Sequence, residues 1–161
     1  MSLQNFEIIS GDSESKVILH VPHSATFIPD DVRNNILLSD QDLKAELDEM
    51  TDTLTEGIAL KATEISGKKP WLFINRFSRL VIDPERFPDE REAMNAVGMG
   101  AVYQKTSIGT QLRNPDRTLE KQLLDDTKEK LGCFYPNSKQ LEKYLMSESL
   151  TGNSHSTLAT F

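Results

Sequence analysis

Residues 72–87, LFINRFSRLVIDPERF, constrain the fold more than any other stretch of this 161-residue sequence. One apolar run ends in Asn75 and Arg76, and a second ends in Asp83, with Arg86 close behind. A buried strand with a guanidinium at its exit places an anion-binding group at the edge of a sheet, where ligands of α/β proteins usually bind. The stretch therefore predicts a carboxylate-binding site at a sheet edge.

The arginines of this stretch allow two interpretations. Arg76, Arg79 and Arg86 could be solvated charges that pair with nearby acidic side chains, which is common for surface residues. Alternatively, they bind the carboxylate of a ligand. In that case we expect Arg76 to be the principal anchor, because Arg79 and Arg86 have acidic neighbours that would neutralise them.

Composition narrows the class of protein. The chain is long enough for one sizeable core, so residues 1–161 are expected to form a single domain. Its net charge of −7 argues against a nucleic-acid partner. No apolar run is long enough for a membrane span, and the N-terminus does not resemble a signal peptide, so the expected compartment is the cytoplasm. One cysteine excludes an internal disulfide and a thiolate-rich zinc site.

Three apolar runs predict strands around which the fold is built. Phe6–Ile9 is a short strand, Val17–Val21 is a buried strand stopped by Pro22, and 71–74 begins a central strand. Strands alternating with helices at this spacing indicate an α/β sheet. His23 then lies in the loop that leaves the second strand, at the edge where catalytic groups collect.

A long helix is expected from Asp40, with Ser39 as its N-cap, to about Ile65. Its apolar positions recur at three- and four-residue steps and define a core face: Leu43, Leu47, Met50, Leu54, Ile58 and Ile65. Asp48 and Asp52 are four residues apart and would point the same way. A metal ion or an arginine would offset their repulsion, although a solvated acidic face explains them equally well.

The remaining elements follow from turn and capping residues. Residues 106–114 predict a hairpin with Gly109 at its turn, and Asp116 predicts the cap of a helix over 117–131. A second helix is expected over 136–146. Residues 147–161 turn small and polar, which predicts an irregular tail.

The chain has three histidines, so the choice of metal ligands is small. His23 is the best candidate ligand because of its place after a strand. A carboxylate from the helix, Asp52 first and Asp48 second, would complete a His-carboxylate pair of the kind that binds zinc. An ion held in this way would activate a bound water molecule, which makes His23 and Asp52 the candidate catalytic residues.

The order of these motifs resembles that of the N-formylglutamate amidohydrolase family. VPHS at 21–24, DEMTD at 48–52, NRFSRLVIDPERF at 75–87 and a glycine-rich segment at 98–104 follow one another as they do in that family. The resemblance covers roughly residues 16–113, and the NRFSRLVIDPERF stretch is its most specific part.

This resemblance implies a fold and a reaction. The fold would be a three-layer mixed sheet flanked by helices, similar to zinc carboxypeptidases and phosphorylase/hydrolase-like proteins. The reaction would be hydrolysis of the amide bond of an N-acyl, in particular N-formyl, acidic amino acid such as N-formylglutamate. His23 and an acidic residue of 48–52 would hold zinc, and Asn75, Arg76 and Arg79, with Arg86 as a further candidate, would bind the substrate carboxylate.

The C-terminal part departs from the family pattern. His155 stands in GNSHSTLATF without the apolar strand expected before the family's last histidine, so the chain resembles a truncated or divergent member whose fold is incomplete at that end. His155 is the remaining candidate ligand, but we expect it not to complete the metal site and turnover to be slow or absent. The alternative function is an inactive homologue or carboxylate-binding module. An exposed sheet edge would favour a homo-oligomer.

Overall fold

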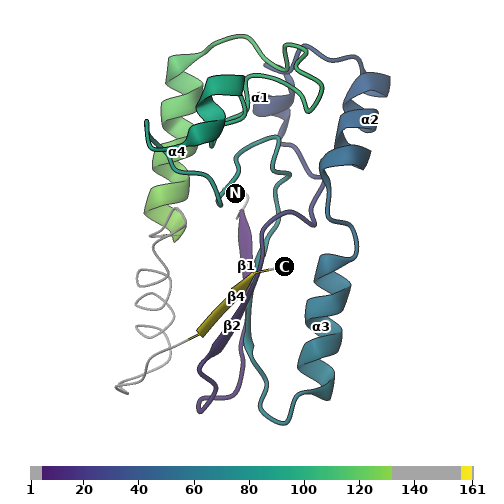
Figure 1. Ribbon diagram of the computed structural model, residues 1–161, viewed down its shortest axis with the longest axis vertical. Coiled ribbons are helices and arrows are strands. Elements are labelled where there is room, and N and C mark those ends of the chain that lie inside the picture. The colour runs from purple at the N-terminus through teal and green to yellow at the C-terminus, as the bar shows by residue number, and fades with distance from the viewer. Residues whose placement is uncertain (1–4, 132–156, 161) are drawn as a thin grey trace.

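The computed structural model of the protein describes residues 5–131 and 157–160 (Figure 1). Four strands form one sheet, α3 runs alongside it, and the other helices gather beyond one end of the strands. The elements in chain order are β1 (Phe6–Ile9), β2 (Val17–Val21), α1 (Asp30–Arg33), α2 (Asp40–Met50), α3 (Thr55–Ile65), β3 (Trp71–Asn75), the 3-10 helix η1 (Ala93–Val97), α4 (Arg117–Leu131) and β4 (Thr157–Thr160).

The sheet is mixed, with strand order β1-β3-β2-β4. β1 pairs antiparallel with β3, whereas β2 runs parallel to both β3 and β4. Because Val21 pairs with Ile74, β2 and β3 end side by side, and the chain leaves both at the same edge. The sheet confirms the prediction of a mixed α/β fold and brings the segments after residues 21 and 75 together.

One face of the sheet packs against α3 through small side chains. Ala59 is fully buried and lies in a core with Leu19, Val21, Leu72 and Ile74. The alternation of these residues along β2 and β3 is the two-residue period of a strand, so one face of each strand points at the helix. Burial of apolar residues at this contact stabilises the position of both strand ends.

The long helix expected over 40–65 is wrong in one respect, because it is two helices. Residues 51–54 break it, and Asp52 lies in the break, where its N–H donates to the carbonyl of His23 at 3.0 Å. The break changes which side of the second helix faces the core. Leu54, Ile58 and Ile65, expected to be buried, are therefore exposed.

The stretch that opened the sequence analysis forms a buried loop beyond β3. We call residues 78–86 the site loop. Its apolar members Leu80, Val81 and Ile82 are buried, although they form a turn rather than a strand. Their partners come from α1, α2 and the segment after η1, and include Val32, Leu43, Ala101, Tyr103 and Leu112. The loop is thus held by a core of its own.

Capping and turn residues predicted the start of α2 and the elements after the site loop. Ser39 caps α2 by accepting from the Asp42 N–H, and the Asp116 carboxylate accepts from two N–H groups at the start of α4. Lys105 and Gln111 pair across a hairpin in which Gly109 has a φ of 84°. We call residues 103–113 the hairpin segment.

The predicted irregular tail is wrong for residues 157–160, which form β4 and pair in parallel with β2. Two threonines favour a strand at this position. The backbone N–H and C=O groups of these residues pair with β2, and nothing in the local sequence indicated that partner. Residues 132–156, which include the predicted helix over 136–146, the rest of the tail and His155, lie outside the described residues. None of the described helices is long and apolar enough to cross a membrane.

Candidate active site

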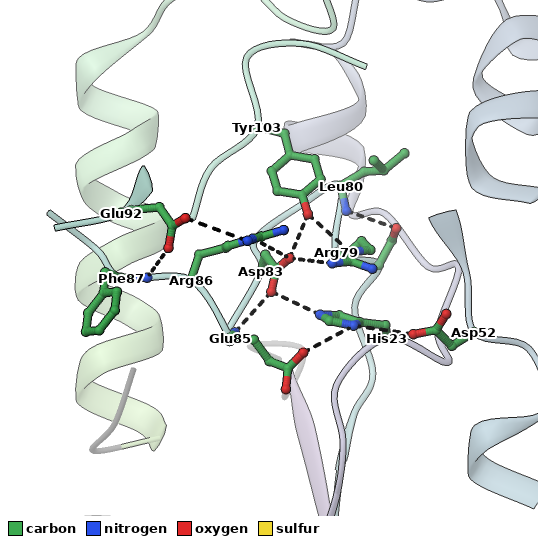
Figure 2. Close-up of polar contacts among 11 residues, drawn as sticks. His23, Asp52, Arg79, Leu80, Asp83, Glu85, Arg86, Phe87, Glu92 and Tyr103 are labelled. Carbon is green, nitrogen blue, oxygen red and sulfur yellow. Dashed lines mark hydrogen bonds and ion pairs between the residues drawn. The ribbon is translucent and has the colours of Figure 1, made fainter. Parts of the chain in front are cut away.

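His23 is buried at the edge where β2 and β3 end, and three carboxylates surround its ring (Figure 2). Its Nε2 lies 3.0 Å from Oδ1 of Asp83. Asp83 is ionised, as its contacts below require, so Nε2 carries the proton and donates it. This hydrogen bond fixes the orientation of the ring and turns Nδ1 away from Asp83.

Asp83 accepts more hydrogen bonds than the other carboxylates of the site. It is fully buried, and its Oδ2 accepts from Tyr103 at 2.6 Å and from Arg79 at 2.8 Å. Burial favours the protonated form, but the hydrogen bond and charge of His23, together with Arg79 and Tyr103, outweigh it and hold the pKa of Asp83 well below its usual range. Burial and the charge of Asp83 raise the pKa of Tyr103 to about 12, so the phenol remains a donor.

The other ring nitrogen of His23 faces two carboxylates. Nδ1 lies 3.5 Å from Oδ2 of Asp52 and 3.6 Å from Oε2 of Glu85, and these residues approach the ring from different sides in Figure 2. Burial raises the pKa of Glu85, and the neighbouring charge of Asp83 adds to the effect. Nδ1 and the two carboxylates therefore lie close enough to share a proton or a cation.

Three residues of the site lie close enough together to share a metal ion. His23, Asp83 and Glu85 each offer an atom within 4.8 Å of the others, and Asp52 contacts the same ring nitrogen of His23 as Glu85 does. Both Asp83 oxygens are already engaged by His23, Arg79, Tyr103 and the Glu85 N–H. The free donors are therefore Nδ1 of His23 and the carboxylates of Asp52 and Glu85, with Asp83 as the outer partner of the histidine.

The structure contradicts the reason for choosing Arg76 as the carboxylate anchor. Its guanidinium pairs with Glu56 at 3.0 Å and also with Glu7, so it has two acidic partners rather than none. Arg79 donates hydrogen bonds to Asp83 and to Tyr103, and the pairing with Asp83 was expected from its acidic neighbours in the sequence. Both guanidiniums therefore already have hydrogen-bonded partners within the protein.

Arg86 is the least committed arginine beside the site. Its Nε lies 3.6 Å from Oδ2 of Asp83 and its NH1 lies 3.6 Å from Oε1 of Glu92, both longer than a hydrogen bond. Nε is buried and has no hydrogen-bond partner. Figure 2 shows Arg86 on the side of Asp83 that faces away from Asp52. A carboxylate could bind here without displacing a close ion pair.

Two other predicted residues lie away from these contacts. Asn75 is buried on β3, and its Oδ1 has no hydrogen-bond partner. Asp48 is exposed on α2 and pairs with Lys44, so it does not share a face with Asp52. The structure thus brings together His23, Asp52, Arg79 and Arg86 from the predicted set.

Reasoning from the sequence missed Asp83, Glu85 and Tyr103 as site residues. Asp83 and Glu85 follow an apolar run, and this position was interpreted only as a source of counter-charges for the arginines. An acidic residue after a buried run could have been weighed as a partner for His23 in the same way as Asp52. Tyr103 carried no local signal, because its role depends on a contact with a residue 20 positions earlier.

Comparisons with known proteins agree with the motifs and the fold. A crystal structure of an N-formylglutamate amidohydrolase from Ralstonia eutropha JMP134 superposes with a TM-score of 0.60 at 17% identity, over 91% of this chain and 52% of that one. The chain thus spans about half the length of that protein, and at this identity the likeness shows the fold. No curated protein matches the chain. The family pattern described as N-formylglutamate amidohydrolase matches residues 15–146, and the chain therefore belongs to the N-formylglutamate amidohydrolase family.

Proposed function

We propose that the protein is a zinc-dependent hydrolase that cleaves the amide bond of an N-acyl acidic amino acid, with N-formylglutamate as the first substrate to test. The observation that carries the proposal is the position of His23 Nδ1, within 3.6 Å of the carboxylates of both Asp52 and Glu85. Family membership supports the same reaction. A three-layer arrangement like that of zinc carboxypeptidases and a cytoplasmic location are part of the proposal.

Zinc would be held by Nδ1 of His23 and by oxygens of Asp52 and Glu85. Three protein ligands of nitrogen and oxygen type, with room for a further group, are the usual set for catalytic zinc. Bound there, zinc would supply a nucleophile at neutral pH and polarise the acyl carbonyl. Glu85 then takes the third place for which His155 was considered.

The chain's own residues orient this set. The Nε2–H of His23 is held by Asp83, so the ring cannot turn Nδ1 away from Asp52 and Glu85 without breaking a buried hydrogen bond. Arg79 and Tyr103 hold Asp83 in turn. The substrate carboxylate would bind at Arg86, whose planar guanidinium can form two parallel hydrogen bonds to it.

The alternative is an inactive homologue or module that binds a carboxylate without hydrolysing it. It is favoured by the fact that His23 is the only histidine that contacts the carboxylates of the site within residues 5–131 and 157–160. In this case Nδ1 of His23 would carry a proton, and the imidazolium would pair with Asp52 and Glu85. The two functions differ in what lies between His23, Asp52 and Glu85, which would be a zinc ion in the hydrolase and a proton in the binding module.

The test is the metal content of protein purified without chelator, together with formate release from N-formylglutamate. We expect one equivalent of zinc and slow hydrolysis that stops when a chelator removes the metal. His23→Asn should lower zinc affinity by more than the roughly 10- to 100-fold typical of losing an outer partner, because it removes a ligand itself. His155→Ala is the matched control and should retain zinc and activity.

Two outcomes would contradict the proposal. Protein that binds no zinc yet binds a dicarboxylate would favour the carboxylate-binding module. Loss of zinc in His155→Ala but not in His23→Asn would mean that the ligand set is wrong.

A substitution at Arg86 tests the carboxylate anchor. Arg86→Lys should weaken the binding of glutarate, a dicarboxylate that cannot be hydrolysed, by about tenfold, since lysine keeps the charge but loses one of two charge-assisted hydrogen bonds. Arg76→Lys is the control and should change affinity little, because Glu7 and Glu56 already occupy that guanidinium. Calorimetric titration measures both. A larger loss in Arg76→Lys would restore Arg76 as the anchor.

A further inference from the structure

Arg113 is a buried cation that the proposed reaction does not use. Its side chain is 1% exposed, and its Nε and NH1 have no hydrogen-bond partner. Burial lowers its pKa to about 10 against the opposing charge of Glu120, so the guanidinium is still protonated at neutral pH. A buried charge without a close counter-charge is costly. The contact that Arg113 does make is therefore informative.

That contact joins Arg113 to the middle of the site loop. Its NH2 donates to the carbonyl oxygen of Leu80. Leu80 stands between Arg79 and Asp83, whose side chains pair at 2.8 Å. The loop here is a turn and belongs to no strand of the sheet. Its backbone is therefore not held in place by hydrogen bonds between paired strands. A charge-assisted hydrogen bond to this carbonyl restrains the backbone between the two functional side chains.

The backbone around Arg113 is itself firmly placed. Arg113 forms an antiparallel bridge with Ile36, and the adjacent Leu112 donates its N–H to the carbonyl of Gln104 at 2.9 Å. At the other end of the hairpin segment, Tyr103 donates to Asp83. The hairpin segment therefore contacts the site loop on its backbone, through Arg113, and on two side chains, since Tyr103 donates to Asp83 and accepts from Arg79.

We propose that Arg113 is a positioning residue that holds the site loop at its midpoint and thereby keeps Asp83 in contact with His23. The inference rests on the proposed function only where it concerns metal affinity, because the contact between Asp83 and His23 uses Nε2 and not the proposed ligand atom Nδ1. A purely structural role would stabilise the core and leave that contact unchanged. The two roles can be separated by a measurement on His23 itself.

The test compares two arginines that both donate to backbone carbonyls. Arg113→Met replaces the guanidinium with an uncharged side chain that still fills apolar space. Arg33→Met is the matched control, since Arg33 donates to the carbonyls of Ile36 and Leu38 and to Asp40, which all lie outside the site loop. The readout is the Nε2–H resonance of His23 in a heteronuclear NMR spectrum of the metal-free protein, assigned through its absence in His23→Asn.

We expect the His23 resonance to be visible in the native protein and in Arg33→Met, and to be lost through solvent exchange in folded Arg113→Met. A variant that unfolds more easily but keeps the resonance unchanged would overturn the proposal. If Arg113→Met does not fold, Arg113→Lys serves instead, because it keeps the charge with a different donor geometry. The resonance should then weaken, and an unchanged resonance overturns the proposal in the same way.

Metal affinity gives the second readout and keeps the two hypotheses apart. Arg113→Met should lower zinc affinity by about tenfold or more, in the range typical of outer partners of a metal site, while Arg33→Met leaves it unchanged. If the native protein binds no zinc, the proposed function fails, and the His23 resonance still decides whether Arg113 positions the loop. If zinc binds and its affinity is equal in all three proteins, the positioning role is rejected.

Discussion

Asp83→Asn is expected to lower the free energy of unfolding by about 3–5 kcal/mol, the usual cost of removing one partner from a buried ion pair. The carboxylate is fully buried and accepts hydrogen bonds from His23, Arg79 and Tyr103. Asparagine has one acceptor oxygen and no charge, so the largely buried guanidinium of Arg79 would lose its counter-charge. Urea titration at neutral pH measures the difference.

Asp48→Asn is the control for this substitution. Asp48 and its partner Lys44 are both exposed and four residues apart on α2, so the loss should be about 0.3–0.5 kcal/mol. The same two variants separate the roles of the carboxylates in metal binding. Asp83→Asn should lower zinc affinity 10- to 100-fold by releasing His23, whereas Asp48→Asn should leave it unchanged. Equal effects of the two substitutions on stability would contradict the central role of Asp83.

The parts of the fold that were predicted correctly depend on short-range patterns. β1, β2 and the start of β3 follow from continuous apolar runs closed by proline or glycine, and the caps at Ser39 and Asp116 follow from side chains that bond N–H groups two or three residues ahead. The hairpin around Gly109 is equally local. In each case the residues that determine the structure are neighbours in the sequence.

The break between α2 and α3 was missed because its cause is a long-range contact. The apolar period continues through residues 51–54, and only the hydrogen bond from Asp52 to the carbonyl of His23 shows why the helix stops there. The β-branched Thr51 and Thr53 were the one local sign of weakness in the helix. The break also has a functional consequence, since it turns Asp52 from a helix-surface residue into a neighbour of the His23 ring.

The site itself could be predicted only in part. His23 and Asp52 were chosen for residue type and position, and the structure brings them to 3.5 Å. The central contact of the site joins His23 to Asp83, 60 residues away, and no pattern in either segment specifies it. The ion pair of Arg76 has the same origin, because its partner Glu7 is 69 residues away in the sequence and is brought close by the pairing of β1 with β3. Residue types in the sequence indicated the chemistry of the site. Tertiary contacts decided which histidine, carboxylates and arginines come together to form it.

A second large effect is expected from His20, whose ring is buried against Phe73 with neither nitrogen hydrogen-bonded. Burial lowers the pKa of His20 from 6.5 to about 4, and the nearby His23 acts in the same direction against the weaker opposing effects of Asn75 and Asp83. Between these two values the unfolded chain binds a proton that the folded protein does not. Acidification through this range therefore favours the unfolded state.

The free energy of unfolding should consequently fall by roughly 3 kcal/mol between neutral pH and pH 4 on account of His20 alone, as the displacement of its pKa implies. His20→Gln keeps a polar side chain that does not titrate, so the variant should lack this part of the loss. Urea titrations of both proteins at several pH values, compared as a difference, isolate the contribution. Asp83 does not confuse the comparison, because its lowered pKa confines its own loss of stability to pH below its ordinary value of 3.8. If the difference between native protein and His20→Gln stays constant from pH 7 to pH 4, His20 is either charged in the folded state or reaches solvent, and its burial does not control acid stability.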